Sequence, residues 1–409
     1  MKKRVMILGA GQLQVPILEK AKERGYEIII VSPDVNQPGI PYADFVVKAD
    51  VKDQEVILRA AREYRIDGIT TDQTDLPVRT AADVADMMCL PSIGYDMGCL
   101  FTNKYMQRER CRALGIPSPR FSLTYSAEEA INSLKEIGIP AIIKPIDSQA
   151  SHGVAKISNE KELKEKYQEA AAYSRDGGVL VEQWIEGTEF PVDSYVINGE
   201  CTLMAIGQYN PFTLKDVFSS YKTVWPARQP ESILRLIEET NKRIIEGFGL
   251  KTGRTHAEYL VSGGNCYLVE VGARGGGSFF SSDDVRYVSG ISTEDFLLDF
   301  ATGNELKLTV SQERHACCCT LFFYLPENGT VISNNGIDVV KELPYVRRNN
   351  LDSIHLGMTT PPVTDKGARN YIVVVAESYE QLDERVNFIQ ERLRIETDCG
   401  NKVLLPIWK

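Results

Sequence analysis

The chain has 409 residues, which allows two or three domains at roughly 100–200 residues each. Its content of 43% hydrophobic and 25% charged residues indicates a folded globular protein rather than a disordered chain. The formal net charge of −10, with lysines spread along the sequence, argues against a nucleic-acid surface, which needs clustered Lys and Arg.

The sequence shows no sign of a membrane segment or of disulfide bonding. No apolar run approaches the roughly 18 residues of a membrane helix, and Met1–Arg4 leads straight into a strand rather than a signal peptide. We therefore expect a cytoplasmic protein. The nine cysteines lack CxxC spacing, which favours free thiols. Because Cys317, Cys318 and Cys319 are consecutive, a strand would point them to alternate faces, and we expect a core role rather than a metal site.

The N-terminal part predicts a parallel α/β domain. Residues 1–32 contain two apolar runs separated by a glycine turn and a helix-period stretch, which is the pattern of a βαβ unit. Residues 53–64 and 75–88 predict helices around a strand at 67–71. Strands that alternate with helices in this way favour a parallel sheet covered by helices.

The first glycine turn does not match a nicotinamide-binding site. Residues 9–11 give a GxG, but Gln14 stands where the third glycine would fall, and residues 31–32 supply no acidic residue for a ribose. The alternative is a tight turn whose backbone amides hold a small anion or polar substrate. Thr74 and Asp75 follow the 67–71 strand, at the edge where a parallel sheet presents side chains to a crevice, so they are candidates for substrate binding.

Two lysines occupy places where phosphate could bind. Lys144 ends the apolar strand AIIK and precedes the loop SQASHG, whose small residues can surround a phosphate with backbone amides and hydroxyls. The sequence shows no carboxylate partner for Lys144, which favours a phosphate over a solvated lysine. Lys104, in a helix that begins near Phe101, is a weaker candidate by itself. His152 in the loop could contact phosphate or an incoming amine, or serve only the structure of the loop.

Residues 179–198 predict two strands joined by a turn. Glu182 ends the first strand and Glu189 begins the second, with Trp184 and Ile185 between them. Such a segment could supply an apolar slot and backbone hydrogen bonds for an adenine, and a carboxylate for ribose hydroxyls. The alternative is a hairpin with an exposed turn.

The segment THAEYLVSGGNCYLVEVGARGGGS, residues 255–278, predicts a hairpin with one glutamate on each strand, between residues that look half-buried. If residues 263–265 form a three-residue loop, Glu258 faces Glu270 directly, with Cβ atoms about 4.5–5.5 Å apart. Opposed carboxylates need a positive partner, and we expect it to come from outside the chain. Mg²⁺ fits because it prefers two carboxylates plus substrate phosphates. Scattered charges on a surface hairpin are the alternative.

Charged residues also flank these glutamates. Arg254 and His256 share a strand face with Glu258, because side chains alternate along a strand. Arg274 follows Glu270 and precedes the glycines 275–277, where a backbone can approach anionic oxygens closely.

Together these segments resemble the ATP-grasp superfamily in residue type, order and spacing. The resemblance rests on Lys104, the IIKP strand, SQASHG, VEQWIEGTE, and HAEYL with VEVGAR, and it covers almost the whole chain. Within the superfamily, the sequence is similar to carboxylate-amine (L-amino acid) ligases and to purine-biosynthesis and carbamoyl-phosphate-synthase-like enzymes. The implied fold is α/β and α+β: a parallel α/β pre-grasp domain at 1–100, an ATP-grasp domain at 101–305 with a lid part at about 115–185, and a small α+β cap at 306–409.

The resemblance also implies ligands for these residues. Lys104 and Lys144 would hold the α and β phosphates of ATP, and Ser148, Ser151 and Gly153 would belong to a mobile loop over the γ phosphate. The adenine and ribose contacts would be Glu182, Gln183, Trp184, Ile185 and Glu189.

The metal and catalytic residues follow in the same way. Glu258 and Glu270 would bind Mg²⁺, with Mn²⁺ as the alternative metal. Arg274, Lys144 and His152 would act on the phosphoryl group and on an acyl phosphate. One departure concerns Gly272, because many members of the superfamily carry asparagine there as a further metal ligand.

The implied reaction is an ATP-dependent ligation. A substrate carboxylate would attack the γ phosphate, and an amine would capture the resulting acyl phosphate, which requires alignment and charge neutralisation rather than a side-chain nucleophile. The alternatives are a purine-biosynthesis enzyme that uses bicarbonate or formate with a ribonucleotide amine, and a nucleotide-binding protein without catalysis. Expected partners are small carboxylate and amine substrates, not nucleic acid or membrane, with a homodimer as the default assembly.

Overall fold

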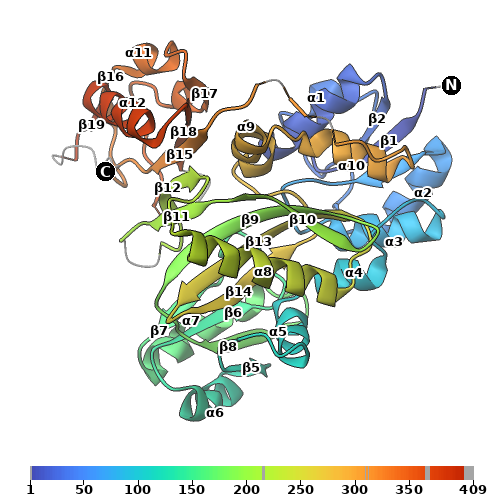
Figure 1. Ribbon diagram of the computed structural model, residues 1–409, viewed down its shortest axis with the longest axis horizontal. Coiled ribbons are helices and arrows are strands. Elements are labelled where there is room, and N and C mark those ends of the chain that lie inside the picture. Colours follow the sequence, from blue (N-terminus) through green and yellow to red (C-terminus); the bar gives the residue numbers. More distant parts are fainter. Residues whose placement is uncertain (1, 214–216, 309, 312, 364–368, 400–409) are drawn as a thin grey trace. The chain divides into compact units, whose positions relative to one another are not determined.

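The computed structural model describes residues 2–213, 217–308, 310–311, 313–363 and 369–399 (Figure 1). Residues 400–409 of the predicted cap lie outside this part. The chain divides into two compact units. The large unit contains Met1–Met204, Pro230–Arg286 and Gly290–Ser311, and the small unit contains Ala205–Gln229, Tyr287–Ser289 and Gln312–Lys409. None of the helices in the described ranges is long and apolar enough to cross a membrane.

The large unit begins with a parallel α/β domain. Its elements are β1 (Arg4–Leu8), η1 (Gln12–Gln14), α1 (Val15–Glu23), β2 (Glu27–Val31), η2 (Ile40–Tyr42), β3 (Phe45–Val47), α2 (Gln54–Tyr64), β4 (Gly68–Thr70), α3 (Val78–Met87) and α4 (Tyr95–Leu100). The strand order is β3-β2-β1-β4, and every pairing is parallel. α2 and α3 cover one face, whereas α1 packs on the other with α10 (Thr293–Ala301), which returns from far along the chain. This arrangement confirms the predicted parallel domain.

The turn after β1 is filled by a side chain. Gln14 is buried, and its Nε2 donates to the carbonyl of Asp72 at 2.8 Å. The Oε1 of Gln14 lies 3.1 Å from the place that a Cβ on Gly11 would take. A dinucleotide fingerprint instead keeps this space open for a pyrophosphate.

A second, antiparallel sheet occupies residues 121–183. Its elements are β5 (Phe121–Thr124), α6 (Ala127–Ile137), β6 (Ala141–Pro145), β7 (Ala155–Ile157), α7 (Glu160–Ala172) and β8 (Val179–Gln183), with strand order β5-β8-β6-β7. Side chains of α6 and α7 pack on the strands in one apolar core. We call this part the lid sheet.

The third sheet carries the two glutamates. Its strands are β9 (Thr188–Ile197), β10 (Glu200–Ile206), β13 (Gly253–Ser262) and β14 (Asn265–Gly272), in the order β10-β9-β13-β14. The large unit also contains α5 (Lys104–Ala113), α8 (Glu231–Phe248) and the π-helical turn η3 (Phe280–Asp284), whereas α9 (Val285–Ser289) is divided between the two units. β8 belongs to the lid sheet, whereas β9 pairs with β13. The two strands predicted at 179–198 exist, and the alternative of a hairpin is wrong, because residues 184–187 link two different sheets.

The register of the β13–β14 hairpin differs from the prediction at the loop. Gly263 and Gly264 form a two-residue turn with φ of 55° and 77°, which is the positive-φ geometry of a type I′ turn. The predicted three-residue loop is therefore wrong by one residue. Val269 then forms a β-bulge that adds one residue to β14, and beyond it Glu258 is paired directly with Glu270. The bulge restores the predicted opposition of the two glutamates.

The small unit is built on a five-stranded antiparallel sheet. Its elements are β11 (Gln208–Pro211), β12 (Ser220–Trp225), β15 (Cys317–Phe323), β16 (Val331–Asn335), α11 (Ile337–Lys341), β17 (Val346–Asn349), η4 (Leu351–Ser353), β18 (Asn370–Ala376), α12 (Tyr379–Arg392) and β19 (Arg394–Thr397). The order of the large sheet is β11-β12-β15-β18-β17, and β16 pairs with β19. Cys317, Cys318 and Cys319 are buried in β15, which confirms their predicted core role.

Candidate active site

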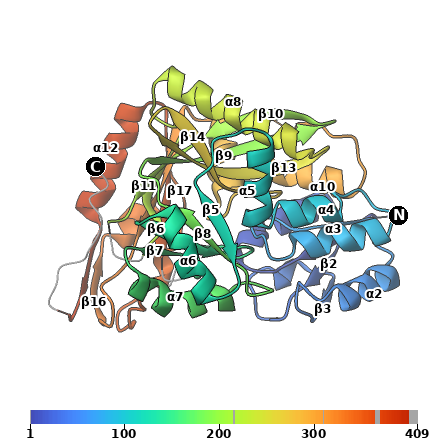
Figure 2. The same cartoon turned by 90° about the horizontal axis from the view of Figure 1, so that it is seen from below.

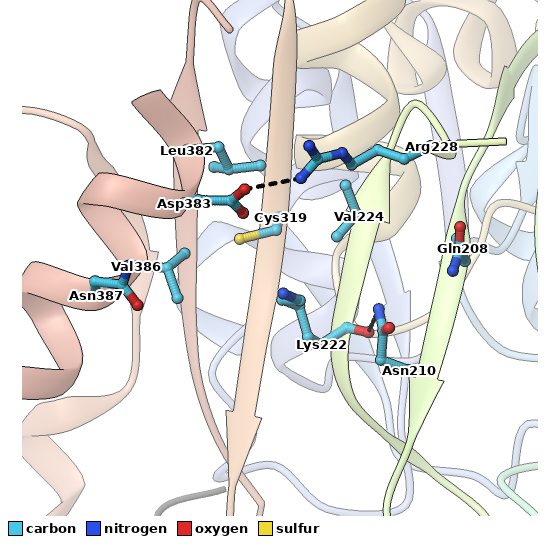
Figure 3. Close-up of a pocket in the computed structure, with 10 residues that line it drawn as sticks. All are labelled: Gln208, Asn210, Lys222, Val224, Arg228, Cys319, Leu382, Asp383, Val386 and Asn387. Carbon is cyan, nitrogen blue, oxygen red and sulfur yellow. Dashed lines mark hydrogen bonds and ion pairs between the residues drawn. The ribbon is translucent and has the colours of Figure 1, made fainter. Parts of the chain in front are cut away.

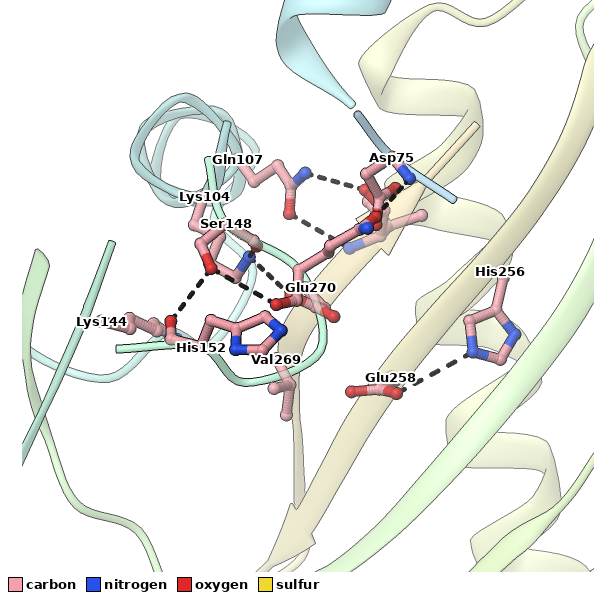
Figure 4. Close-up of polar contacts among 12 residues, drawn as sticks. Asp75, Lys104, Gln107, Lys144, Ser148, His152, His256, Glu258, Val269 and Glu270 are labelled. Carbon is pink, nitrogen blue, oxygen red and sulfur yellow. Dashed lines mark hydrogen bonds and ion pairs between the residues drawn. The ribbon is translucent and has the colours of Figure 1, made fainter. Parts of the chain in front are cut away.

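One face of α5 holds the strand that carries Glu270. Asn103 caps the helix by accepting from the amide of Met106 at 3.0 Å, so Lys104 is its first residue. Lys104 and Gln107 are three residues apart and lie on the same helical face. Lys104 Nζ contacts Glu270 Oε2 at 2.7 Å, and the carboxamide of Gln107 donates to the carbonyl of Val271 at 2.8 Å and accepts from its amide at 3.1 Å (Figure 4). The helix therefore fixes the backbone on which Glu270 stands.

Arg108, the next residue on this face, holds the β-bulge itself. Its Nη2 donates to the carbonyl of Val269 at 2.8 Å, and Val269 is the extra residue of β14. A bulge leaves backbone groups outside the regular ladder, and here a buried guanidinium satisfies one of them. Arg108 was missed from the sequence. Its position four residues after Lys104 on one helix was the available signal.

The positive partner of Glu270 is Lys104 of the chain itself, which corrects the expectation that it would come from outside the chain. Burial alone would raise the pKa of Glu270, but the ammonium of Lys104 lowers this pKa to about 2. Lys104 Nζ also donates to the carbonyl of Ser148 at 2.6 Å, so helix, hairpin and loop meet at one cation. Three of the predicted site residues are thus adjacent.

Lys144 lies in a buried ion triad. Its Nζ is 2.5 Å from Glu182 Oε2, and Arg108 Nε is 2.6 Å from Glu182 Oε1. The inference that Lys144 has no carboxylate partner is corrected, because β6 and β8 are neighbours and only tertiary pairing brings Glu182 alongside. Burial lowers the pKa of Lys144 to about 8 against the attraction of Glu182. The pKa of Glu182 is lowered, since its two cations outweigh the opposing effect of burial.

Glu258 stands at the end of a second buried chain of charges. On β9, Asp193 contacts Arg254 Nη2 at 2.6 Å and His256 Nδ1 at 2.8 Å, and His256 Nε2 lies 3.9 Å from Glu258 Oε1. Burial opposes the charged imidazole, but the Asp193 carboxylate raises the pKa of His256 to about 9. Arg254, His256 and Glu258 share a face as expected. Asp193 was missed, and its signal was a charged residue in the middle of an apolar strand.

The donors present fit a magnesium ion. Glu258 and Glu270 are both half-buried and directly opposed. Over the described ranges, no cluster of three or more His, Cys, Asp or Glu side chains is arranged to hold a metal. Two carboxylates completed by substrate phosphates are the donor set that Mg²⁺ commonly uses in nucleotide sites, whereas a full protein cage suits other metals.

Arg274 is held by Asp75. The guanidinium makes a two-pronged contact, with Nε at 2.9 Å from Oδ1 and Nη2 at 2.6 Å from Oδ2. Burial alone would lower the pKa of Arg274, but the Asp75 carboxylate raises this pKa above its ordinary value. A Cβ on Gly272 would stand 2.7 Å from Asp75 Oδ1 and 3.1 Å from Arg274 Nε, so a side chain such as asparagine cannot enter without moving this pair. The glycine therefore makes room for the Asp75–Arg274 pair.

The loop between β6 and β7 makes contacts at both ends of the site. Ser148 Oγ donates to the carbonyl of His152 at 2.9 Å, and the ring of His152 stacks on Tyr173 with centroids 5.2 Å apart. Gln149 Oε1 accepts from the Thr74 hydroxyl at 3.0 Å and from the Asp75 amide at 2.7 Å. Gln149 was missed, yet it ties the loop to the segment that holds Arg274. Ser151 and Gly153 have φ of 54° and 71° in the same loop.

The residues predicted to contact adenine lie at the junction of two sheets. The amide of Gln183 donates to the carbonyl of Arg120 at 2.8 Å, and the amide of Trp184 donates to that of Pro140 at 3.2 Å. Two predicted backbone donors are thus already used within the protein. Ile185 follows in the linker, and Glu189 lies on β9 opposite Leu260. Glu182 is in the ion triad instead of an open slot.

Two further buried acids lie in the large unit. Asp72 Oδ2 and Glu294 Oε1 are buried without a hydrogen-bond partner, although Asp72 Oδ1 accepts from the amide of Gly275 at 2.9 Å. Burial raises the pKa of Asp72 to about 6. Burial and the nearby Asp72 raise the pKa of Glu294 to about 8. Neither residue was identified as buried from the sequence.

The raised pKa of Glu294 predicts how the stability of the protein depends on pH. Its folded-state pKa of about 8 is above the ordinary 4.5, so the contribution of the protonated form is complete below pH 4.5 and is lost as pH rises through 8. As the pH rises from 4.5 to 8, the free energy of unfolding of the wild type should fall. We expect the fall in Glu294→Gln to be smaller by roughly 2 kcal/mol or more. Urea unfolding across this pH range measures it, with the exposed Glu200→Gln as control. Parallel profiles for the wild type and Glu294→Gln would contradict it.

The chain matches two domain families. Residues 1–92 match the ribonucleotide synthetase preATP-grasp domain, and residues 137–283 match the ATP-grasp domain. The second match contains Lys144, the loop, Glu182 and the whole β13–β14 hairpin. The chain therefore carries a preATP-grasp domain in front of an ATP-grasp domain.

Known relatives cover different shares of the chain. A D-alanine–D-alanine ligase of Pseudomonas entomophila is 35% identical over 122 residues, which are 30% of this chain and 37% of that ligase. The chain thus matches little more than a third of that relative's length. A formate-dependent phosphoribosylglycinamide formyltransferase of Actinobacillus pleuropneumoniae is 27% identical over 289 residues, or 66% of this chain and 69% of that protein.

A solved structure matches nearly the whole fold. An L-amino acid ligase from Bacillus licheniformis has a TM-score of 0.80 at 22% identity and covers 97% of this chain and 98% of that chain. The likeness extends over both compact units and establishes the fold.

Proposed function

We propose that this protein is an ATP- and magnesium-dependent ligase that joins a carboxylate to an amine through an acyl phosphate. The observation that carries the proposal is the direct opposition of Glu258 and Glu270, with Lys104 bound to Glu270. A phosphate-binding cation and two metal-binding carboxylates at one place suit a nucleotide triphosphate with its metal.

In the first step, an oxygen of the substrate carboxylate would attack the γ phosphorus of ATP, and the bond to ADP would break. Lys104 and Lys144 would bind the phosphate chain, and the loop at 148–153 would exclude water from it. Glu258 and Glu270 would hold magnesium, which offsets the negative charge of the phosphates. No side-chain nucleophile is needed, because the substrate oxygen forms the new bond.

In the second step, the amine nitrogen would attack the acyl carbon, and inorganic phosphate would leave. The amine must lose a proton as the amide forms. Arg274 would neutralise negative charge on the acyl phosphate, since a guanidinium pairs well with phosphate oxygens. Asp75 would keep the guanidinium oriented for this contact.

The test is phosphate release from Mg·ATP in the presence of pools of carboxylic acids crossed with pools of amines and amino acids. We expect release that needs both pools. A carboxylate labelled with oxygen-18 should transfer one labelled oxygen to the released phosphate. The attacking oxygen joins carbon to phosphorus in the acyl phosphate, and it leaves with the phosphate when the amine attacks the carbon. Phosphate release that needs both substrates but carries no labelled oxygen would overturn the acyl-phosphate route.

A second candidate has the same chemistry with particular substrates. The 27% identity over 289 residues to a formate-dependent phosphoribosylglycinamide formyltransferase favours formate as the acid and a phosphoribosyl amine as the acceptor. Release supported by formate and this amine, but by no amino acid, would select it. ATP binding without release in any pool would select a non-catalytic nucleotide-binding protein.

We expect Lys144→Met to weaken Mg·ATP binding by about tenfold or more, because a charged contact to phosphate is lost. The wild-type affinity should also fall as pH rises through about 8, where the Lys144 ammonium loses its proton, and the variant should lack this fall. Calorimetric titration measures both. Lys161→Met, an exposed lysine on α7, is the control. Unchanged affinity in Lys144→Met would remove Lys144 from the nucleotide site.

A further inference from the structure

The small unit contains a cavity of about 430 Å³, and none of the residues of the candidate active site lines it (Figure 3). Its floor is one face of the sheet and its wall is α12. The lining residues are Gln208 and Asn210 on β11, Lys222 and Val224 on β12, Arg228, Cys319 on β15, and Leu382, Asp383, Val386 and Asn387 on α12. Cavities for small molecules commonly measure about 300–1,000 Å³.

The register of the sheet explains why these residues share the cavity. Val224 pairs with Gln208 on one side and with Cys319 on the other, and Lys222 pairs with Asn210. Residues two apart on a strand face the same side, so Lys222 and Val224 point to the same space. The floor is thus built by three adjacent strands rather than by a loose loop.

Charge is divided within the cavity. Lys222, on the floor, is 9% exposed, whereas Arg228 and Asp383 are exposed at the edge. Arg228 Nη1 contacts Asp383 Oδ2 at 2.8 Å, and its guanidinium lies over the ring of Tyr379 at 4.7 Å. Asp383 is the one acidic side chain among the residues that line the cavity. A lysine on the floor and the Arg228–Asp383 ion pair at the edge therefore occupy separate positions in the lining.

We propose that this cavity binds a free α-amino acid. The ligand carboxylate would contact Lys222, and the ligand ammonium would contact Asp383, which already tolerates a cation beside it. An aliphatic side chain would pack on Val224, Leu382 and Val386, which belong to the apolar core of the unit. Inorganic phosphate would leave this apolar surface unused, and a purely apolar ligand would make no use of the charged side chains of Lys222 and Asp383.

The test uses the full chain with methyl-labelled leucine and valine, observed by NMR during titration with unlabelled leucine. We expect saturable shifts of the methyl signals of Val224, Leu382 and Val386. This readout separates the cavity from amino-acid binding in the ATP-grasp site, where none of these methyl groups lies. Absence of these shifts at millimolar leucine and at millimolar concentrations of other aliphatic amino acids would overturn the proposal.

Two variants test the two charges. Lys222→Met should weaken binding by about tenfold or more, because charged hydrogen bonds contribute more than neutral ones. Lys341→Met is the matched control, because Lys341 lies in the same unit and pairs with the exposed Asp352. Equal affinity in Lys222→Met and Lys341→Met would overturn the carboxylate assignment.

If Lys222→Met does not fold, Asp383→Asn provides an independent test at an exposed position. The wild type should bind leucine more tightly than the acid that lacks its amino group. Asp383→Asn should lose this preference, since the amide carries no charge to attract the ammonium. A variant that keeps the preference would overturn the amino-acid class of the ligand.

Discussion

Glu270→Gln should lower the rate of Mg·ATP-dependent phosphate release by about a hundredfold or more, while the protein stays folded. The substitution keeps the shape of the side chain but removes the charge that pairs with Lys104 at 2.7 Å and faces Glu258 across the hairpin. Magnesium would then lose one of its two carboxylate ligands, and the negative charge of the phosphates in the transition state would be neutralised less well. Steady-state phosphate release measures the rate, and circular dichroism checks the fold.

The control for this variant is Glu200→Gln. Glu200 is an exposed glutamate on β10 of the same sheet, so the same atoms change without touching the site. We expect Glu200→Gln to keep the wild-type rate, and Glu270→Gln to need a higher magnesium concentration for its residual rate. Activity in Glu270→Gln that stays within about tenfold of the wild type would contradict the metal-binding role.

Arg108→Met should lower the free energy of unfolding by about 3–5 kcal/mol, the usual effect of removing one partner from a buried ion pair. Glu182 would remain buried with Lys144 as its one remaining cation, and the carbonyl of Val269 would lose its donor. Because this carbonyl belongs to the β-bulge beside Glu270, we also expect phosphate release by any folded fraction to need a higher magnesium concentration. Urea denaturation measures the stability.

Arg235→Met is the matched control for Arg108→Met. Arg235 pairs with Glu231 four residues away on α8, and both side chains are about 70% exposed in the structure. Removing an exposed pair usually costs about 0–1 kcal/mol. A loss in Arg108→Met no larger than in Arg235→Met would mean that the ion triad does not stabilise the fold.

The hairpin shows how a correct inference can follow from an incorrect detail. The sequence predicted that Glu258 faces Glu270, and this pairing is confirmed, but through a two-residue turn and a bulge rather than a three-residue loop. Nothing in the local pattern marks Val269 as the bulge residue. Its position depends on Arg108, which comes from a helix some 160 residues away in the chain.

The same distinction holds for the charged residues. Lys104, Lys144, Glu258, Glu270 and Arg274 were predicted from residue types at strand and helix ends. Glu182, the partner of Lys144, and Asp75, the partner of Arg274, were not recognised as such, because they come from other strands and segments. Asp193, which contacts Arg254 and His256, was missed for the same reason. Gly272 was read as a departure from a motif, whereas the structure shows that the Asp75–Arg274 pair occupies the space of a side chain.

By itself, the sequence determined the α/β class, the order of the domains and the positions of the lysines and glutamates, because hydrophobic periodicity and turn residues act over short distances along the chain. Only the tertiary structure decided which charge neutralises which. Lys104 meets Glu270, and Arg108 and Lys144 meet Glu182, across sheets whose pairing no local pattern encodes. Burial makes these contacts strong, and burial is a property of the assembled fold.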